Sequence, residues 1–119
     1  MDWVSQLKVI QLDIIKFKYK GIIMQKGYIL FAHRSPADPE KREAYIKLAF
    51  PAIKSAGGKV LAQSKNVIVK ENGINERTIL VEFDTLEKAT NAYNSKDYQE
   101  ALKVLDNGSD RDVRIFEGI

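Results

Sequence analysis

Apolar and polar positions change their period several times along the chain, and each change marks a predicted element. Residues 27–33, GYILFAH, alternate between the two sides of a strand, yet both sides are apolar. Residues 77–83, RTILVEF, repeat this pattern, and residues 113–117, VRIFE, predict a last strand. A strand covered on one face should alternate apolar with polar residues, so we expect both faces of the central strands to be covered.

Helical spacing follows the first strand. Asp38 fits an N-cap and Pro39 the first helical position, whereas Gly57-Gly58 provides a stop. Pro51 lies inside the pattern and removes one backbone donor, which predicts a single helix with a kink near residues 47–50. The predicted buried stripe comprises Tyr45, Leu48, Ala49, Ala52, Ile53 and Ala56. The basic side chains expected to face water are Lys41, Arg42, Lys47 and Lys54.

Two shorter helices are predicted further along the chain. The first begins at Asp84 or Thr85, and the second begins at Ser95 and stops at Asn107-Gly108. Their buried stripes are predicted to be Leu86, Ala89, Ala92 and Tyr93 in the first, and Tyr98, Ala101, Leu102 and Leu105 in the second.

The remaining strand is less sharply defined. Residues 59–62 and 66–71 predict either one interrupted strand or two short ones, before a turn at Asn72-Gly73. The order is then β-α-β-β-α-β, which is typical of an α+β, ferredoxin-like fold. Its four-stranded antiparallel sheet has the order 4-1-3-2 and carries the helices on one face.

This arrangement leaves one sheet face bare, although the central strands are apolar on both sides. An exposed apolar sheet would be an unusually large patch for a monomer. We therefore expect a homodimer in which two sheets pack face to face. The alternative is that residues 1–23 cover the bare face within one chain.

Residues 1–23 combine two incompatible periods. A helical spacing of four, three, four and three residues overlaps strand-like alternation over residues 15–20; the helical positions are Trp3, Leu7, Ile10, Ile14 and Phe17. One interpretation is a mobile tail, or upstream sequence preceding a natural start at Met24. The other is an amphipathic helix that docks on the domain or on a partner. We therefore divide the chain into an extension, residues 1–23, and a domain, residues 24–119.

Composition excludes several function classes. The 119 residues are 45% apolar and 29% charged, which is ordinary for one soluble domain, and no apolar run is long enough to span a membrane. The absence of cysteine excludes disulfides, thiolate metal sites and a cysteine nucleophile, and it fits a cytoplasmic protein. Of the net charge of +3, four lysines and two aspartates in residues 1–23 supply +2. The domain itself is nearly neutral, so we expect neither nucleic acid nor membrane as a partner.

Several motifs occur in order from residue 26 onward: KGYILFAH, DPE, a proline-containing helix ending in GG, RTILVEF, AYNSKDY and RIFEG. Through them the sequence resembles the bacterial domain of unknown function 1330 family. The resemblance implies the dimeric α/β-barrel superfamily, and hence the face-to-face dimer, but no established reaction. Two departures occur: Gln63-Ser64-Lys65 replaces an Arg-Gly-Gly-like turn, and Asp84 stands where the family tends to have proline.

The predicted strand order gathers basic residues at one end of the sheet. The end of the first strand lies beside the starts of the third and fourth, which brings together His33, Arg34, Arg77, Arg111 and Arg114. Guanidinium groups bind carboxylates in a bidentate fork, so Arg77 and Arg114 are predicted to bind a small organic anion. His33, with an ordinary pKa near 6.5, is the predicted catalytic acid or base. The alternative is that these are solvated charges at strand ends.

Three other side chains are candidates. Tyr93 and Tyr98 lie on helical stripes, where they either line the ligand site with their hydroxyls or pack in the core. Glu82 lies between apolar residues of a central strand, so its carboxylate is either paired or directed into a cavity as a second catalytic group. One histidine without cysteine cannot form a standard metal site, and no cofactor is expected; haem would require His33 as its axial ligand.

Two functions follow. The first is a cofactor-independent enzyme acting on an organic anion in the cavity between sheet and helices, because relatives in the superfamily implied by the resemblance run cofactor-free oxygenations and isomerisations. The second is a non-catalytic dimeric module that binds a ligand or a partner. A pocket lined by His33, Arg77 and Glu82 would favour the enzyme. A pocket filled by aromatic side chains would favour the module; these are Phe31, Phe83 and Phe116.

Overall fold

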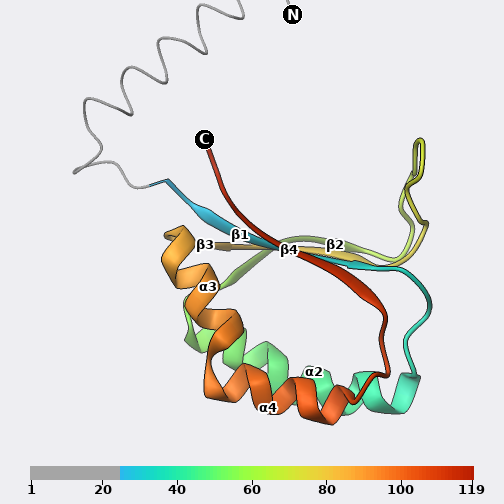
Figure 1. The fold of residues 1–119 in the computed structure, drawn as a ribbon, viewed down its shortest axis with the longest axis horizontal. Helices are drawn as coiled ribbons and strands as arrows, with labels where there is room; N and C mark the ends of the chain where they lie inside the picture. The colour runs from blue at the N-terminus through green and yellow to red at the C-terminus, as the bar shows by residue number, and fades with distance from the viewer. Residues whose placement is uncertain (1–24) are drawn as a thin grey trace, which may run out of the picture.

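A four-stranded antiparallel sheet forms one layer of the molecule (Figure 1). The computed structural model describes residues 25–119, so the predictions for residues 1–23 lie outside the described residues. The strands are β1 (Gly27–His33), β2 (Lys59–Ser64), β3 (Thr78–Phe83) and β4 (Arg111–Glu117), in the order β2-β3-β1-β4. This order is the predicted 4-1-3-2 arrangement, which confirms the ferredoxin-like α+β fold.

Three helices lie against one face of the sheet (Figure 1): α2 (Pro39–Ser55), α3 (Leu86–Asn94) and α4 (Lys96–Leu105). Side chains cap each of them, because Asp38, Thr85 and Ser95 accept hydrogen bonds from the amides of the first turns. Helix α2 passes through Pro51 as one element, as predicted. Leu48, however, is exposed, so its predicted place in the buried stripe is wrong. None of the described helices is long and apolar enough to cross a membrane.

The core lies between the sheet and the helices. Its most deeply buried large side chains are Ile29 and Phe83 from the sheet and Tyr98 from α4. Small residues of the helices, Ala49, Ala52, Ala89, Ala92 and Ala101, let the helices approach the sheet closely. Gly27 is required by the same close packing, since a Cβ there would lie 2.6 Å from the backbone N and Cα of Leu86.

The opposite face of the sheet is the open face, because no described helix covers it. The ring of Tyr28 stacks on that of Phe116 with centroids 5.6 Å apart, and Phe116 is 44% exposed. Leu30 lies beside Leu80 on the neighbouring strand. The expectation that both faces of the central strands are covered is thus met only on the helical side within residues 25–119.

The region after β2 differs from the prediction. Strand β2 continues to Ser64, with a register shift between Val60 and Ala62, but residues 66–71 form no strand. Instead residues 65–77 form a loop that projects on the side of the sheet away from the helices (Figure 1). A strand needs backbone hydrogen bonds from a neighbour, and Val67 donates its amide instead to the side chain of Asn75.

Candidate functional site

An inner cavity of about 270 Å³ lies between the sheet and helices α2 and α4. Most of its wall is apolar and comes from both layers, including Phe31, Ile46, Phe50, Ile53, Val60 and Val81. Polar side chains gather where β1 ends and β4 begins; they are His33, Arg42, Tyr45, Ser109 and Arg111. A mostly apolar cavity with a few convergent polar groups is the usual form of a small-molecule site.

A second, outer hollow of about 590 Å³ adjoins the inner cavity and shares His33, Arg42 and Ile46 with it. Its basic side chains outnumber its acidic ones: Arg42, Lys47, Lys65 and Arg77 against Glu43 and Glu76. The two spaces therefore form one site with an apolar inner part and a cationic outer part.

His33 stands at the junction of the two spaces. It is only 7% exposed, its Nδ1 lies 3.1 Å from Ser109 Oγ, and its amide donates to the carbonyl of Arg77 at 2.9 Å. Burial, together with the charges of Arg111, Arg42 and Arg77, lowers the pKa of His33 from 6.5 to about 4. The imidazole is therefore neutral at pH 7, and within residues 25–119 no protein hydrogen bond engages its Nε2.

Arg42 is the main correction to the predicted site. It was expected to face water, but it is half-buried and lines both the inner cavity and the outer hollow. Burial and the nearby charge of Arg77 lower the pKa of Arg42. Among residues 25–119, neither Arg42 nor Arg77 has an acidic partner within ion-pair distance, so both guanidinium groups are free to pair with a bound anion.

Arg111, unlike Arg42 and Arg77, is held by aromatic side chains. Its guanidinium lies over the rings of Phe31 and Tyr45, 5.2 and 5.1 Å from their centroids, and Nη1 donates to Tyr45 Oη at 3.1 Å. Tyr45 Oη also lies 2.7 Å from the hydroxyl oxygen of Tyr98. Burial raises the pKa of Tyr98 far above its usual range, so Tyr98 remains a neutral phenol.

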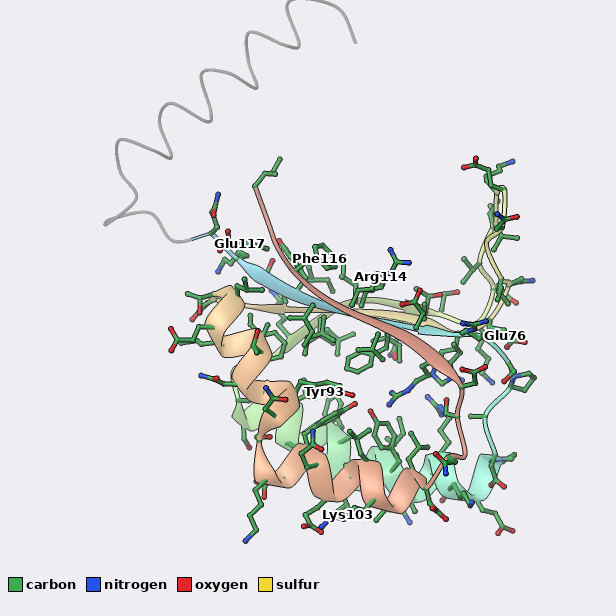
Figure 2. The ribbon with its side chains drawn as sticks, in the orientation of Figure 1. Glu76, Tyr93, Lys103, Arg114, Phe116 and Glu117 are labelled. Carbon is green, nitrogen blue, oxygen red and sulfur yellow. The ribbon has the colours of Figure 1, made fainter. Side chains whose placement is uncertain are left out.

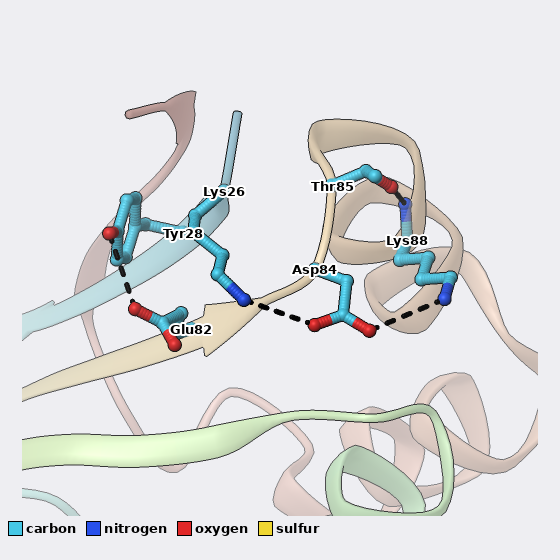
Figure 3. A network of polar contacts seen from close by, with 6 residues as sticks. All are labelled: Lys26, Tyr28, Glu82, Asp84, Thr85 and Lys88. Carbon is cyan, nitrogen blue, oxygen red and sulfur yellow. Dashed lines mark hydrogen bonds and ion pairs between the residues drawn. The ribbon is translucent and has the colours of Figure 1, made fainter. Parts of the chain in front are cut away.

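The structure separates the remaining candidates from the cavity. Arg114 points away from the helices (Figure 2) and binds Asp112, with Nη2 3.0 Å from Oδ2. Glu82 lies on the open face as well, where its carboxylate accepts a hydrogen bond from Tyr28 at 3.3 Å (Figure 3). Beside it, Lys26 and Lys88 both pair with Asp84 in an exposed network (Figure 3).

The two tyrosines from the predicted helical stripes lie in the core layer. Tyr93 is half-buried and packs on Tyr98 with ring centroids 5.1 Å apart. Tyr98 is fully buried and reaches the site only through its contact with Tyr45. The structure thus brings His33 and Arg77 together. Tyr98 lies behind the cavity wall and is hydrogen-bonded to Tyr45 of that wall. Arg114 and Glu82 lie on the other face of the sheet.

Sequence reasoning did not assign Arg42, Tyr45 and Ser109 to the site. The sequence carried a signal for the first two of them. Arg42, Tyr45 and Ala49 are spaced three and four residues apart, so Asp38 as N-cap puts them on one helical face. Ser109 carried none, because its position depends on the path of the loop between α4 and β4.

Comparison with known proteins places the chain in a family. Residues 26–119 match the domain of unknown function DUF1330. The chain belongs to the DUF1330 family. No curated protein matches this DUF1330 chain.

Solved structures share the fold of the DUF1330 chain. A protein of unknown function from Rhodopseudomonas palustris is 16% identical with a TM-score of 0.63, covering 88% of this chain and 92% of that one. A dimeric ferredoxin-like protein of unknown function from Thermobifida fusca is 13% identical, with a TM-score of 0.54 and coverages of 79% and 92%. A protein described provisionally as an antibiotic biosynthesis monooxygenase, from Caulobacter crescentus, is 8% identical, with a TM-score of 0.53 and coverages of 87% and 98%. At these identities the likeness concerns the fold alone.

Proposed function

We propose that this DUF1330 protein binds a small organic acid at the junction of the two spaces and acts on it as a cofactor-independent enzyme. The observation that carries the proposal is the pair of guanidinium groups, Arg42 and Arg77, beside a neutral, buried His33. Arginines without acidic partners in a partly desolvated site favour an anion, because the anion supplies the missing opposite charge.

The cavity walls suggest how such an acid would lie. Its carboxylate would occupy the junction, where Arg42 and Arg77 can each donate in a fork. Its apolar body would enter the inner cavity between Phe31 and Ile53. Arg111 is already hydrogen-bonded to Tyr45 and covered by aromatic rings, so it contributes charge rather than a direct fork.

His33 would move the proton. A neutral imidazole can accept a proton from a carbon–hydrogen bond of the bound carboxylate, and the electron pair of that bond stays on the carbon. The negative charge of the carboxylate offsets the arginine charges that lower the pKa of His33. Binding therefore makes His33 a stronger base at the moment the substrate arrives. We propose His33 as the catalytic residue and assign Glu82 no part in this step, since it lies on the open face.

The proposed protein is a homodimer joined through the open face. The half-exposed Phe116 and the neighbouring Leu30 and Leu80 supply an apolar surface, and the Thermobifida fusca protein of similar fold is described as dimeric. Sedimentation at micromolar concentration should give a dimer, and Leu80→Asp should convert it into a monomer. A folded wild-type monomer would contradict this part of the proposal.

Benzoate binding tests the anion site. At one hundred times Kd, benzoate should add about 2.7 kcal/mol to the free energy of unfolding, seen as a rise in melting temperature. Arg77→Ala and Arg42→Ala should each remove most of this rise without unfolding the protein. Arg34→Ala is the matched control, because Arg34 is exposed and pairs with Asp110. An unchanged rise in the Arg77 and Arg42 variants would eliminate this site.

Proton transfer separates the enzyme from a non-catalytic binding module. Mandelate carries an acidic carbon-bound hydrogen, so its exchange with deuterium in D₂O, followed by NMR, reports proton abstraction. Exchange in the wild-type protein that is lost in His33→Asn supports the enzyme. Binding without exchange for carbon acids of this kind would favour the module.

A further inference from the structure

Tyr45 and Tyr98 form a buried pair of hydroxyls whose proton directions can be deduced. Tyr98 is completely buried, and within residues 25–119 the acceptor in reach of its hydroxyl is Tyr45 Oη, 2.7 Å away. A buried hydroxyl that donates to nothing is costly, so the Tyr98 proton is directed at Tyr45 Oη.

Arg111 donates a second hydrogen bond to the same oxygen atom, Tyr45 Oη. Nη1 is a donor only, and it lies 3.1 Å from Tyr45 Oη. Tyr45 Oη therefore accepts two hydrogen bonds, from Tyr98 and from Arg111. Its own proton cannot point back along either of them and must be directed elsewhere.

We assign the remaining direction to the inner cavity, because Tyr45 is part of its wall. Tyr45 lines that cavity and is only 8% exposed, so the cavity is the open space beside its side chain. No acceptor within the described part of the chain takes this proton. A buried donor in the wall of a mostly apolar cavity is a feature of a site that recognises a ligand oxygen.

From this hydrogen-bond arrangement we infer that Tyr45 is a ligand-binding residue that donates to a second oxygen of the substrate. The inference rests on the proposed function and narrows its substrate class to an apolar organic acid that also carries a carbonyl oxygen. The carboxylate lies at Arg42 and Arg77, and the carbonyl lies in the inner cavity at Tyr45.

Matched ligands test the inference. Acetylbenzoates and isopropylbenzoates have nearly the same shape, but only the acetyl group accepts a hydrogen bond. By titration calorimetry, 3- or 4-acetylbenzoate should bind about threefold to tenfold more tightly than its isopropyl counterpart, as one hydrogen bond to a buried donor predicts. An apolar cavity without a donor would favour the isopropyl compound.

Two variants locate the donor. Tyr45→Phe should abolish the acetyl preference, whereas Tyr98→Phe, which removes a hydroxyl only 2.7 Å away, should keep it. Tyr45→Phe leaves the Tyr98 hydroxyl without its acceptor; if it fails to fold, Tyr45→Phe with Tyr98→Phe removes that unsatisfied group and is measured instead.

The outcomes separate the two proposals. No acetyl preference in the wild-type protein, or a preference that survives Tyr45→Phe, overturns the role of Tyr45. If both compounds then still bind and depend on Arg77, the anion site stands. If neither carboxylate binds, both proposals are overturned.

Discussion

Protonation of His33 should make the free energy of unfolding depend on pH in a way that one substitution removes. The pKa of His33 is lowered to about 4 in the folded protein, whereas an unfolded chain has the ordinary value of 6.5. Between pH 6.5 and pH 4, His33 is therefore mostly protonated in the unfolded chain and mostly unprotonated in the folded protein. Stability is retained above pH 6.5 and is lost as the pH falls toward 4.

The size of this loss follows from the two pKa values. Between pH 7 and pH 5, His33 alone should cost about 2 kcal/mol of folding free energy, and the full difference between the states approaches about 3 kcal/mol. Because stabilities of small domains are about 5–15 kcal/mol, this is a large fraction of the total.

Urea denaturation at half-unit steps from pH 7.5 to pH 5 provides the assay. His33→Asn is the partner variant, because its side-chain amide can still bond Ser109 but does not titrate. Carboxylates titrate similarly in both proteins, so the wild-type minus variant difference isolates His33. That difference should fall by about 2 kcal/mol from pH 7 to pH 5. Parallel curves would refute both the lowered pKa and the idea that arginine charges surround His33.

A saturating organic anion gives an internal check on the same measurement. Benzoate at the junction would offset the charges of Arg42 and Arg77 and so raise the pKa of His33. The benzoate complex should then lose less stability between pH 7 and pH 5 than the free protein. An equal loss would mean that benzoate binds away from His33.

Three further perturbations test the fold. Gly27→Ala should destabilise by about 1–3 kcal/mol in urea denaturation, because its Cβ would lie 2.6 Å from the backbone of Leu86; wild-type stability would contradict the close packing of β1 and α3. Phe83→Ala should cost about 3–5 kcal/mol, since the ring is only 1% exposed, and a much smaller loss would show that the core collapses around it. Removing residues 1–23 should leave the melting temperature within about 5 °C, measured by calorimetry, because the βαββαβ unit is complete without them; a larger drop would show that they cover core surface.

The sequence allowed the fold to be predicted because its decisive signals are local. Asp38 and Ser95 are short polar side chains just before helical spacing, and both cap helices in the structure. The strand order followed from the order of elements. The predicted strand at residues 66–71 was wrong, because the apolar residues there resemble a strand but a strand also needs a hydrogen-bonding partner from elsewhere in the chain. A local pattern does not show whether such a partner is present.

The candidate site could be predicted only in part. The end of the sheet where His33 and Arg77 meet follows from topology alone, and both lie at the junction. Which face each residue occupies depends on register, and the pairing of Leu30 with Arg114 puts that arginine on the open face. Arg42 was missed for another reason: charged residues on helices are usually solvated, and its burial depends on how α2 lies over the sheet.

The three clustered tyrosines of the core have a spectroscopic consequence. The single tryptophan, Trp3, lies outside residues 24–119, so the emission of that domain comes from four tyrosines. Three of these, Tyr45, Tyr93 and Tyr98, form one chain of rings with neighbouring centroids 6.1 and 5.1 Å apart. Rings held this close couple their near-ultraviolet transitions, and one end of the chain lines the inner cavity. The domain therefore carries its own optical reporter, and a ligand entering the cavity can be followed by near-ultraviolet circular dichroism without any label.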